Sequence, residues 1–218
     1  STKIFRNKNI NVNIGILSAD IKNFYKSYIF SKENNLPFIS QKTYKKEFCF
    51  PIDSFYKKIN LYKNEQFFNK INLRFKALYK EKMFLPLIKK DIVSVLSLLQ
   101  SAGAKQYIVS AQNHKILTNL LDYYGLSHYF DGAFGVDNHV AEGKDLIALE
   151  LKKKLYNKNK NFYFIGDTGL DFRVAKKINA SPLLVSWGHY NKERLLLRLN
   201  KNFVFNETSD LKNFFLSL

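Results

Sequence analysis

The chain has 218 residues, of which 46% are hydrophobic, which suits one domain or a domain with a modest insertion. Its 35 basic and 18 acidic residues give a formal charge of +17, which would attract nucleic acid, acidic membranes or phosphorylated ligands. No stretch has the roughly 18–20 apolar residues of a membrane span, and no signal peptide is seen. A single cysteine, Cys49, excludes an internal disulfide, so a soluble protein of the cytoplasm or another reducing compartment is expected.

The first third of the sequence predicts one strand followed by helices. Apolar residues mixed with asparagines over 9–17 indicate a strand, and the apolar spacing over 19–33 and 65–83 is helical. Because no segment between 18 and 84 predicts a strand, we expect a helical block there, inserted after the first strand. Its aromatic residues would pack internally or form an exposed surface for a protein partner; the cluster in question is Tyr44, Phe48, Phe50, Phe55 and Tyr56.

After Pro86 the pattern alternates between helices and short apolar strands. Helices are expected over 87–101, 114–124, 144–156 and 171–179, and strands over 106–110, 132–136, 161–165, 182–186 and 203–205. This alternation predicts an α/β fold with a Rossmann-like parallel sheet covered by helices on both faces. The predicted core consists of residues 1–17 and 85–218, and the predicted cap is the helical block at 18–84.

Two carboxylates follow the strand expected at 161–165. Ligands of parallel α/β sheets bind beyond the carboxyl ends of the strands, and Gly166 lets the chain turn there. Asp167 and Asp171, four residues apart, would face one small space, and such oxygen ligands suit Mg²⁺. In the alternative interpretation, Asp171 simply caps the helix that follows it.

A second polar group follows the strand expected at 106–110. Ser110 and Ala111 would offer a hydroxyl and backbone N–H groups to an anion such as phosphate. Lys144, at the start of another predicted helix, could neutralise a phosphate as a point charge. The alternatives are that Ser110 is an ordinary helix N-cap and that Lys144 is a solvated surface lysine.

The order of these groups, together with the sequence between Pro86 and about Arg194, resembles the haloacid dehalogenase superfamily. The segments that carry the resemblance to its phosphoglycolate-phosphatase-like branch are LLQSAGAKQYIVSAQNH, LLDYYGLSHYFDGAFG, GKD, FIGDTGLDFRVAKKINA and LLVSWGHYNKERL. The resemblance implies a phosphatase core with a small helical cap. It also implies that Ser110 binds the phosphoryl group, Lys144 steadies its charge, and Asp167 and Asp171 hold Mg²⁺.

The first motif of that family is missing. The family's opening strand ends in Asp-x-Asp, whose first carboxylate attacks phosphorus and whose second acts as acid and base. No residue between Asn11 and Leu17 is a carboxylate. Matching Gly15 to the family's glycine puts Val12 and Ile14 at the aspartate positions, and sliding the match by one residue puts Asn11 and Asn13 there. Neither alternative provides a nucleophile, and both weaken the expected Mg²⁺ site.

Three functions are therefore weighed against each other. The first is a phosphatase-like pseudoenzyme that binds phosphate and Mg²⁺ or acts as a scaffold for a protein partner. The second is an active Mg²⁺-dependent hydrolase acting on a small phosphorylated metabolite, such as phosphoglycolate or a sugar phosphate. The third is a nucleic-acid-associated subunit that uses the basic surface, which is not favoured because no recognised binding motif accompanies the charge.

The remaining candidates predict packing more than chemistry. His114, His128, His139 and His189 lack the spacing of metal ligands, and His114 is expected on a helix surface. Trp187 begins a family-like loop, Trp187–Tyr190, and is expected to pack beneath the last helix.

Overall fold

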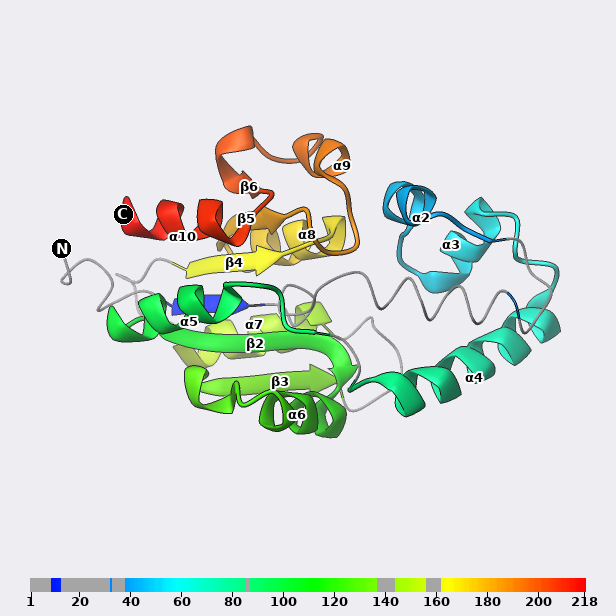
Figure 1. Cartoon of the computed structure of the whole chain (residues 1–218), viewed down its shortest axis with the longest axis horizontal. Coiled ribbons are helices and arrows are strands. Elements are labelled where there is room, and N and C mark those ends of the chain that lie inside the picture. The colour runs from blue at the N-terminus through cyan, green and yellow to red at the C-terminus, as the bar shows by residue number, and fades with distance from the viewer. Residues whose placement is uncertain (1–8, 13–31, 33–37, 85–86, 137–143, 156–161) are drawn as a thin grey trace.

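The computed structural model describes residues 9–12, 32, 38–84, 87–136, 144–155 and 162–218 (Figure 1). In these residues a single parallel sheet has the strand order β3–β2–β1–β4–β5–β6. Its strands are β1 (Asn9–Val12), β2 (Lys105–Asn113), β3 (Gly132–Val136), β4 (Phe162–Gly166), β5 (Ser181–Val185) and β6 (Val204–Phe205). The Rossmann-like parallel sheet predicted from the sequence is thus confirmed.

The helices in the described residues lie either before β2 or between and after the later strands. Those before β2 are α2 (Gln41–Glu47), α3 (Ile52–Lys58), α4 (Glu65–Lys82) and α5 (Ile92–Ser101). The others are α6 (His114–Tyr123), α7 (Lys144–Leu155), α8 (Gly169–Lys177), α9 (Lys192–Leu196) and α10 (Thr208–Leu216), with short 3₁₀ turns at Ser127–Tyr129 and Lys201–Phe203. None of these helices combines the length and apolar character needed to cross a membrane.

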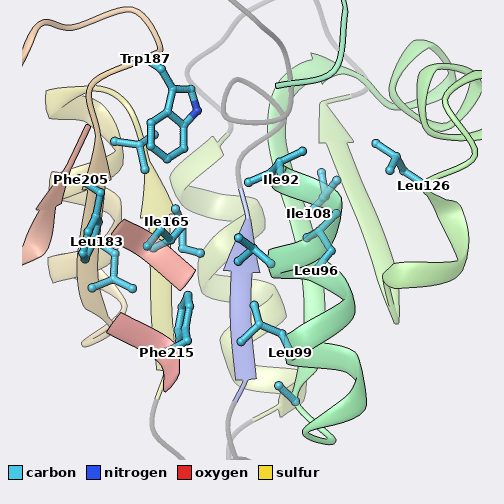
Figure 2. Packing of buried hydrophobic residues seen from close by; sticks show 14 of the residues in the cluster. Ile92, Leu96, Leu99, Ile108, Leu126, Ile165, Leu183, Trp187, Phe205 and Phe215 are labelled. Carbon is cyan, nitrogen blue, oxygen red and sulfur yellow. The ribbon is translucent and has the colours of Figure 1, made fainter. Parts of the chain in front are cut away.

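Both faces of the sheet are buried, because successive side chains along β2 and along β4 belong to different buried clusters. Ile108 of β2 and Ile165 of β4 belong to a cluster that includes residues of α5 and α10. Figure 2 shows this cluster, in which Phe215 lies near Leu183 and Ile165. The neighbouring residues Tyr107, Val109 and Phe164 belong to a second cluster, with side chains of α7 and α8. This two-residue alternation is expected of strands covered by helices on both sides.

The α2–α3 lobe, which we define as residues 41–58, packs against the core. Phe48 and Phe55 are only 5% and 6% exposed and share a cluster with Leu184 of β5 and Leu195 of α9. The sequence left open that the aromatic residues of this lobe form an exposed surface for a partner. For Phe48 and Phe55 that expectation is wrong, because both rings are buried. These rings cover the apolar surface of β5, β6 and α9, and this burial stabilises the lobe in place.

Several element boundaries differ from those predicted. The helix expected over 87–101 begins only at Ile92, because Asp91 has a left-handed backbone with φ 61° that interrupts the helix. Strand β2 continues to Asn113 instead of ending at Ser110. The helical block expected at 18–84 is described at Lys32 and from residue 38 onward, where it contains no strand. Most of the helix expected over 19–33 lies outside the described residues.

Candidate functional site

The strand order places β1 between the two strands that carry the candidate residues. From β1 the chain passes to β2 and β3 on one side, and then crosses to β4, β5 and β6 on the other. This reversal is the switch point at which open parallel sheets bind ligands. Val12 pairs with Ile108 of β2 and Ile165 of β4. Ser110 and Asp167 each lie two residues beyond those partners, and strand spacing puts their backbones roughly 10 Å apart.

Asp167 is the most enclosed of the candidate residues whose side chains the structure describes. It directly follows β4, has 0% exposure, and its Oδ2 accepts a hydrogen bond from the His189 backbone N at 2.7 Å. A Cβ atom added to Gly188 would lie 2.1 Å from that same oxygen, so only glycine fits there. The loop after β5 therefore approaches the carboxylate with its backbone, and the family-like Trp187–Tyr190 segment contributes to the site.

Asp171 belongs to the helix cap at the start of α8. Its Oδ2 accepts hydrogen bonds from Asp167 N at 3.1 Å, Thr168 N at 3.0 Å and Thr168 Oγ1 at 2.7 Å. Asp171 N donates in return to Thr168 Oγ1 at 3.3 Å, which completes a capping box. Asp171 therefore contributes to the cap from the third helical position, whereas the N-cap residue itself is Thr168. The cap also ties the backbone of Asp167 to the start of the helix.

Ser110 lies in β2 and is 3% exposed. Its Oγ accepts from Gln112 N at 3.1 Å, whereas the N-cap of α6 is Asn113, whose Oδ1 accepts from Ile116 N at 3.3 Å. The interpretation of Ser110 as an ordinary N-cap is therefore wrong, because the strand runs past it. The pairing of β2 with β3 shifts register between Val109 and Asn113, and such irregularities often redirect side chains beside functional sites.

The other candidates are described only in part. Ala111 is a partly exposed residue of β2, and Lys144 is the first residue of α7, as predicted, although its side chain lies outside the described part. Asn11 and Val12 belong to β1, whereas Asn13 and Ile14 lie outside the described residues. The absence of a carboxylate from residues 11–17 is a fact of the sequence and holds in either alignment.

Two carboxylates are the oxygen donors that the described part of the site offers to a metal ion. Within the described ranges, no group of three or more His, Cys, Asp or Glu residues is placed so that it could hold a metal ion. Mg²⁺ commonly takes one or two carboxylates and fills its remaining positions with phosphate and water. One oxygen of Asp171 already accepts three hydrogen bonds. The carboxylates of Asp167 and Asp171 are thus donors of the kind that Mg²⁺ takes together with phosphate and water.

The sequence interpretations of His114 and Trp187 are confirmed. His114 is exposed at the first turn of α6. Trp187 is 7% exposed and packs in the cluster that contains Leu211 and Phe215 of α10. The contributions of Gly188 and His189 were missed. The glycine three residues beyond the buried strand β5 was the available signal, since it permits a close backbone approach.

We compared the chain with known protein families, curated proteins and solved structures. Residues 21–185 match the sequence model described as haloacid dehalogenase-like hydrolase, a match that starts after the segment at 11–17. No curated protein sequence matches the chain.

Among solved structures, a haloacid dehalogenase-like family hydrolase from Streptococcus pneumoniae is similar, with a TM-score of 0.80 at 17% identity over 96% of this chain and 99% of that chain. A predicted phosphatase from Clostridium acetobutylicum has a TM-score of 0.75 at 18% identity, over 97% of this chain and 99% of that chain. A predicted phosphoglycolate phosphatase from Haemophilus somnus has a TM-score of 0.74 at 18% sequence identity, over 97% of this chain and 99% of that chain. At these identities the structural likeness concerns the fold alone. Because the family model covers well over half of the sequence, the chain belongs to the haloacid dehalogenase-like hydrolase family.

Proposed function

We propose that this protein binds a phosphorylated ligand at the carboxyl end of its sheet without hydrolysing it. One combination carries the proposal. Asp167 is buried and held beside the switch point, but the sequence at the tip of the opening strand supplies no carboxylate. A family phosphatase needs both parts, because the opening strand provides the group that bonds to phosphorus.

The missing groups explain why chemistry would stop at binding. If Val12 and Ile14 occupy the aspartate positions, their aliphatic side chains can neither attack phosphorus nor carry a proton. If Asn11 and Asn13 occupy them, the amides are poor nucleophiles and also remove negative charge from the site. Loss of acid–base help alone costs about 10²–10⁴-fold in rate, and loss of a nucleophile usually costs more.

The remaining residues support recognition of phosphate. In the proposal, the Ser110 hydroxyl and the backbone near Ala111 orient the phosphoryl oxygens, and Lys144 contributes positive charge from the start of α7. Asp167 and Asp171 would hold Mg²⁺, which when bound would neutralise charge on the phosphate. Residues 18–84 are the proposed cap over this site, and a protein partner would use surfaces other than the buried rings of Phe48 and Phe55.

Phosphate release provides the first test. With Mg²⁺ and 2-phosphoglycolate, p-nitrophenyl phosphate or sugar phosphates, we expect turnover at background level because the nucleophile is absent. Clear turnover that disappears in Asp167→Ala would contradict the proposal and establish an active phosphatase. Two double variants restore an Asp-x-Asp pair, one for each alignment. They are Val12→Asp with Ile14→Asp, and Asn11→Asp with Asn13→Asp. A gain of turnover in either pair would identify the register of the lost motif.

Binding provides the second arm of the same test. Titration calorimetry with inorganic phosphate in the presence of Mg²⁺ should show binding to the unaltered protein. Asp167→Asn should weaken it by roughly tenfold or more, since a buried partner of the ligand is removed. Asp210→Asn, which changes a carboxylate in the cap of α10, is the matched control and should bind normally. Equal affinity in both variants would exclude Asp167 from the site.

A further inference from the structure

The loop after β5 contacts both the Asp167 carboxylate and helix α2. His189 makes three of these contacts. Its backbone N donates to Asp167 Oδ2 at 2.7 Å, and its ring Nδ1 shares a hydrogen bond with Tyr44 Oη at 2.6 Å. The same ring stacks on Phe48, with centroids 4.5 Å apart and planes inclined by 17°. One residue thus joins the candidate site to a helix that precedes it by more than a hundred positions in the chain.

Helix α2 is fastened to this part of the core by charged side chains as well. Arg194 Nη1 donates to Lys45 O and Phe48 O, both at 2.9 Å, which satisfies carbonyls at the C-terminal end of α2. The guanidinium lies 3.5 Å from the ring centroid of Tyr190. Lys45 Nζ donates to Ser186 O at 3.2 Å, at the start of the loop. Cations at a helix C-terminus also interact favourably with its dipole.

The contact between loop and carboxylate leaves little freedom. Because a Cβ on Gly188 would lie 2.1 Å from Asp167 Oδ2, the loop backbone and the carboxylate are already at closest approach. A hydrogen bond of 2.7 Å weakens steeply once the donor moves or turns. A shift of the loop would therefore change the contacts that orient this carboxylate. On the other side of the loop, the groups that hold His189 are Tyr44 and Phe48.

We infer that helix α2 sets the orientation of the Asp167 carboxylate through His189, so that Tyr44 and Phe48 are positioning residues for the ligand bound there. The ligand part of this inference rests on the proposed function, whereas the mechanical link from α2 to Asp167 does not. The coupling is reciprocal: a ligand that requires the observed carboxylate geometry also stabilises the docked position of α2. The cap thus regulates affinity at the site by fixing a loop of the core.

Amide hydrogen exchange tests the link without any ligand. Tyr44→Phe removes the hydroxyl that meets His189 and keeps the ring contacts of Tyr44 with Phe48 and Phe55. We expect protection of the His189 amide to fall about three- to tenfold, the range of one ordinary hydrogen bond. Tyr56→Phe is the matched control, since Tyr56 lies in the same lobe and packs on Phe55 and Phe68. Unchanged protection in Tyr44→Phe, with the Leu184 amide still fully protected, would overturn the inference.

Ligand titration then tests the consequence. With inorganic phosphate and Mg²⁺, Tyr44→Phe should bind about three- to tenfold more weakly than the unaltered protein, and Tyr56→Phe should bind equally well. Unaltered affinity in Tyr44→Phe would overturn the positioning role. Absence of binding by the unaltered protein would instead refute the proposed function. In that case the exchange of the His189 amide still decides whether α2 controls the loop.

Discussion

At the scale of single residues, two glycines and one threonine determine how the carboxylates sit. A Cβ on Gly166 would lie 2.2 Å from Asp171 Cβ, and one on Gly188 would lie 2.1 Å from Asp167 Oδ2. The Thr168 hydroxyl donates to Asp171 Oδ2 and accepts from Asp171 N. Each carboxylate is thus fixed both by close backbone approach and by hydrogen bonds. This rigidity is what a binding site needs from the residues that support it.

Thr168→Ala tests the cap at the start of α8. Loss of the hydroxyl removes both bonds to Asp171, so we expect the free energy of unfolding to fall by about 1 kcal/mol, within a range of roughly 0.5–2. Urea denaturation monitored by circular dichroism measures the change. The control is Thr118→Ala, whose hydroxyl donates to exposed carbonyls within α6 and should cost less than about 0.5 kcal/mol. Equal costs for the two variants would contradict the role assigned to Thr168.

The candidate residues also show what a sequence pattern can say about side chains. Spacing alone placed Asp167 and Asp171 between a strand and a helix expected from residue 171. In the structure Asp167 directly follows β4, whereas Asp171 lies in the first turn of α8, which begins at Gly169. The spacing left open whether Asp171 caps the helix, because a cap and a metal ligand use the same residue type at the same position. The N-cap interpretation failed at Ser110 because β2 extends to Asn113, and strand length depends on pairing with β3.

At the scale of elements, the α2–α3 lobe depends on α9 and on the loop that precedes it. Phe48 and Phe55 bury their rings against β5, β6 and α9. Arg194 meets the end of α2 with one nitrogen that donates to two carbonyls. Helix α2 has only seven residues, too few for stability on its own in water, so these tertiary contacts hold it.

Arg194→Lys tests this attachment. A lysine ammonium lacks the planar shape that stacks on Tyr190 while donating to both carbonyls, so we expect unfolding to become easier by about 1–2 kcal/mol. Chemical denaturation provides the measurement. Arg198→Lys, four residues along at an exposed position, is the matched control and should change stability by less than about 0.5 kcal/mol. If both variants are as stable as the unaltered chain, Arg194 does not hold the lobe.

At the scale of the whole molecule, titration of buried and partly buried tyrosines limits stability at high pH. Burial raises the pKa of Tyr56 from 10.0 to about 12. Burial also raises the pKa of Tyr163, and it is the main cause of the raised pKa of Tyr107. The folded protein keeps these protons above pH 10, whereas the unfolded chain loses them. Their contribution to stability is therefore complete below pH 10 and is lost at higher pH, for Tyr56 as the pH rises toward 12.

Tyr56→Phe should reduce the loss of folding stability at alkaline pH. One pKa unit corresponds to about 1.4 kcal/mol, and because the ring of Tyr56 is only partly shielded we expect an effect of about 1 kcal/mol at pH 11.5. Urea denaturation at pH 9 and pH 11.5 gives the difference between the two conditions. Tyr123→Phe, at a side chain that is 61% exposed, should leave the alkaline loss unchanged. An identical decline in Tyr56→Phe and the unaltered protein would contradict the prediction.

The sequence by itself determined the α/β alternation, the approximate strands and helices after Pro86, and the absence of any carboxylate at residues 11–17. These features are local: they depend on hydrophobic spacing or on residue identity, which one stretch of chain carries alone. Only the tertiary structure decided that the loop of Gly188 and His189 closes on Asp167, and that Tyr44 and Phe48 brace it. Those contacts join segments more than twenty and more than a hundred residues apart, and their geometry arises from the packing of β5, α9 and the α2–α3 lobe. No periodicity within a single segment records such an arrangement.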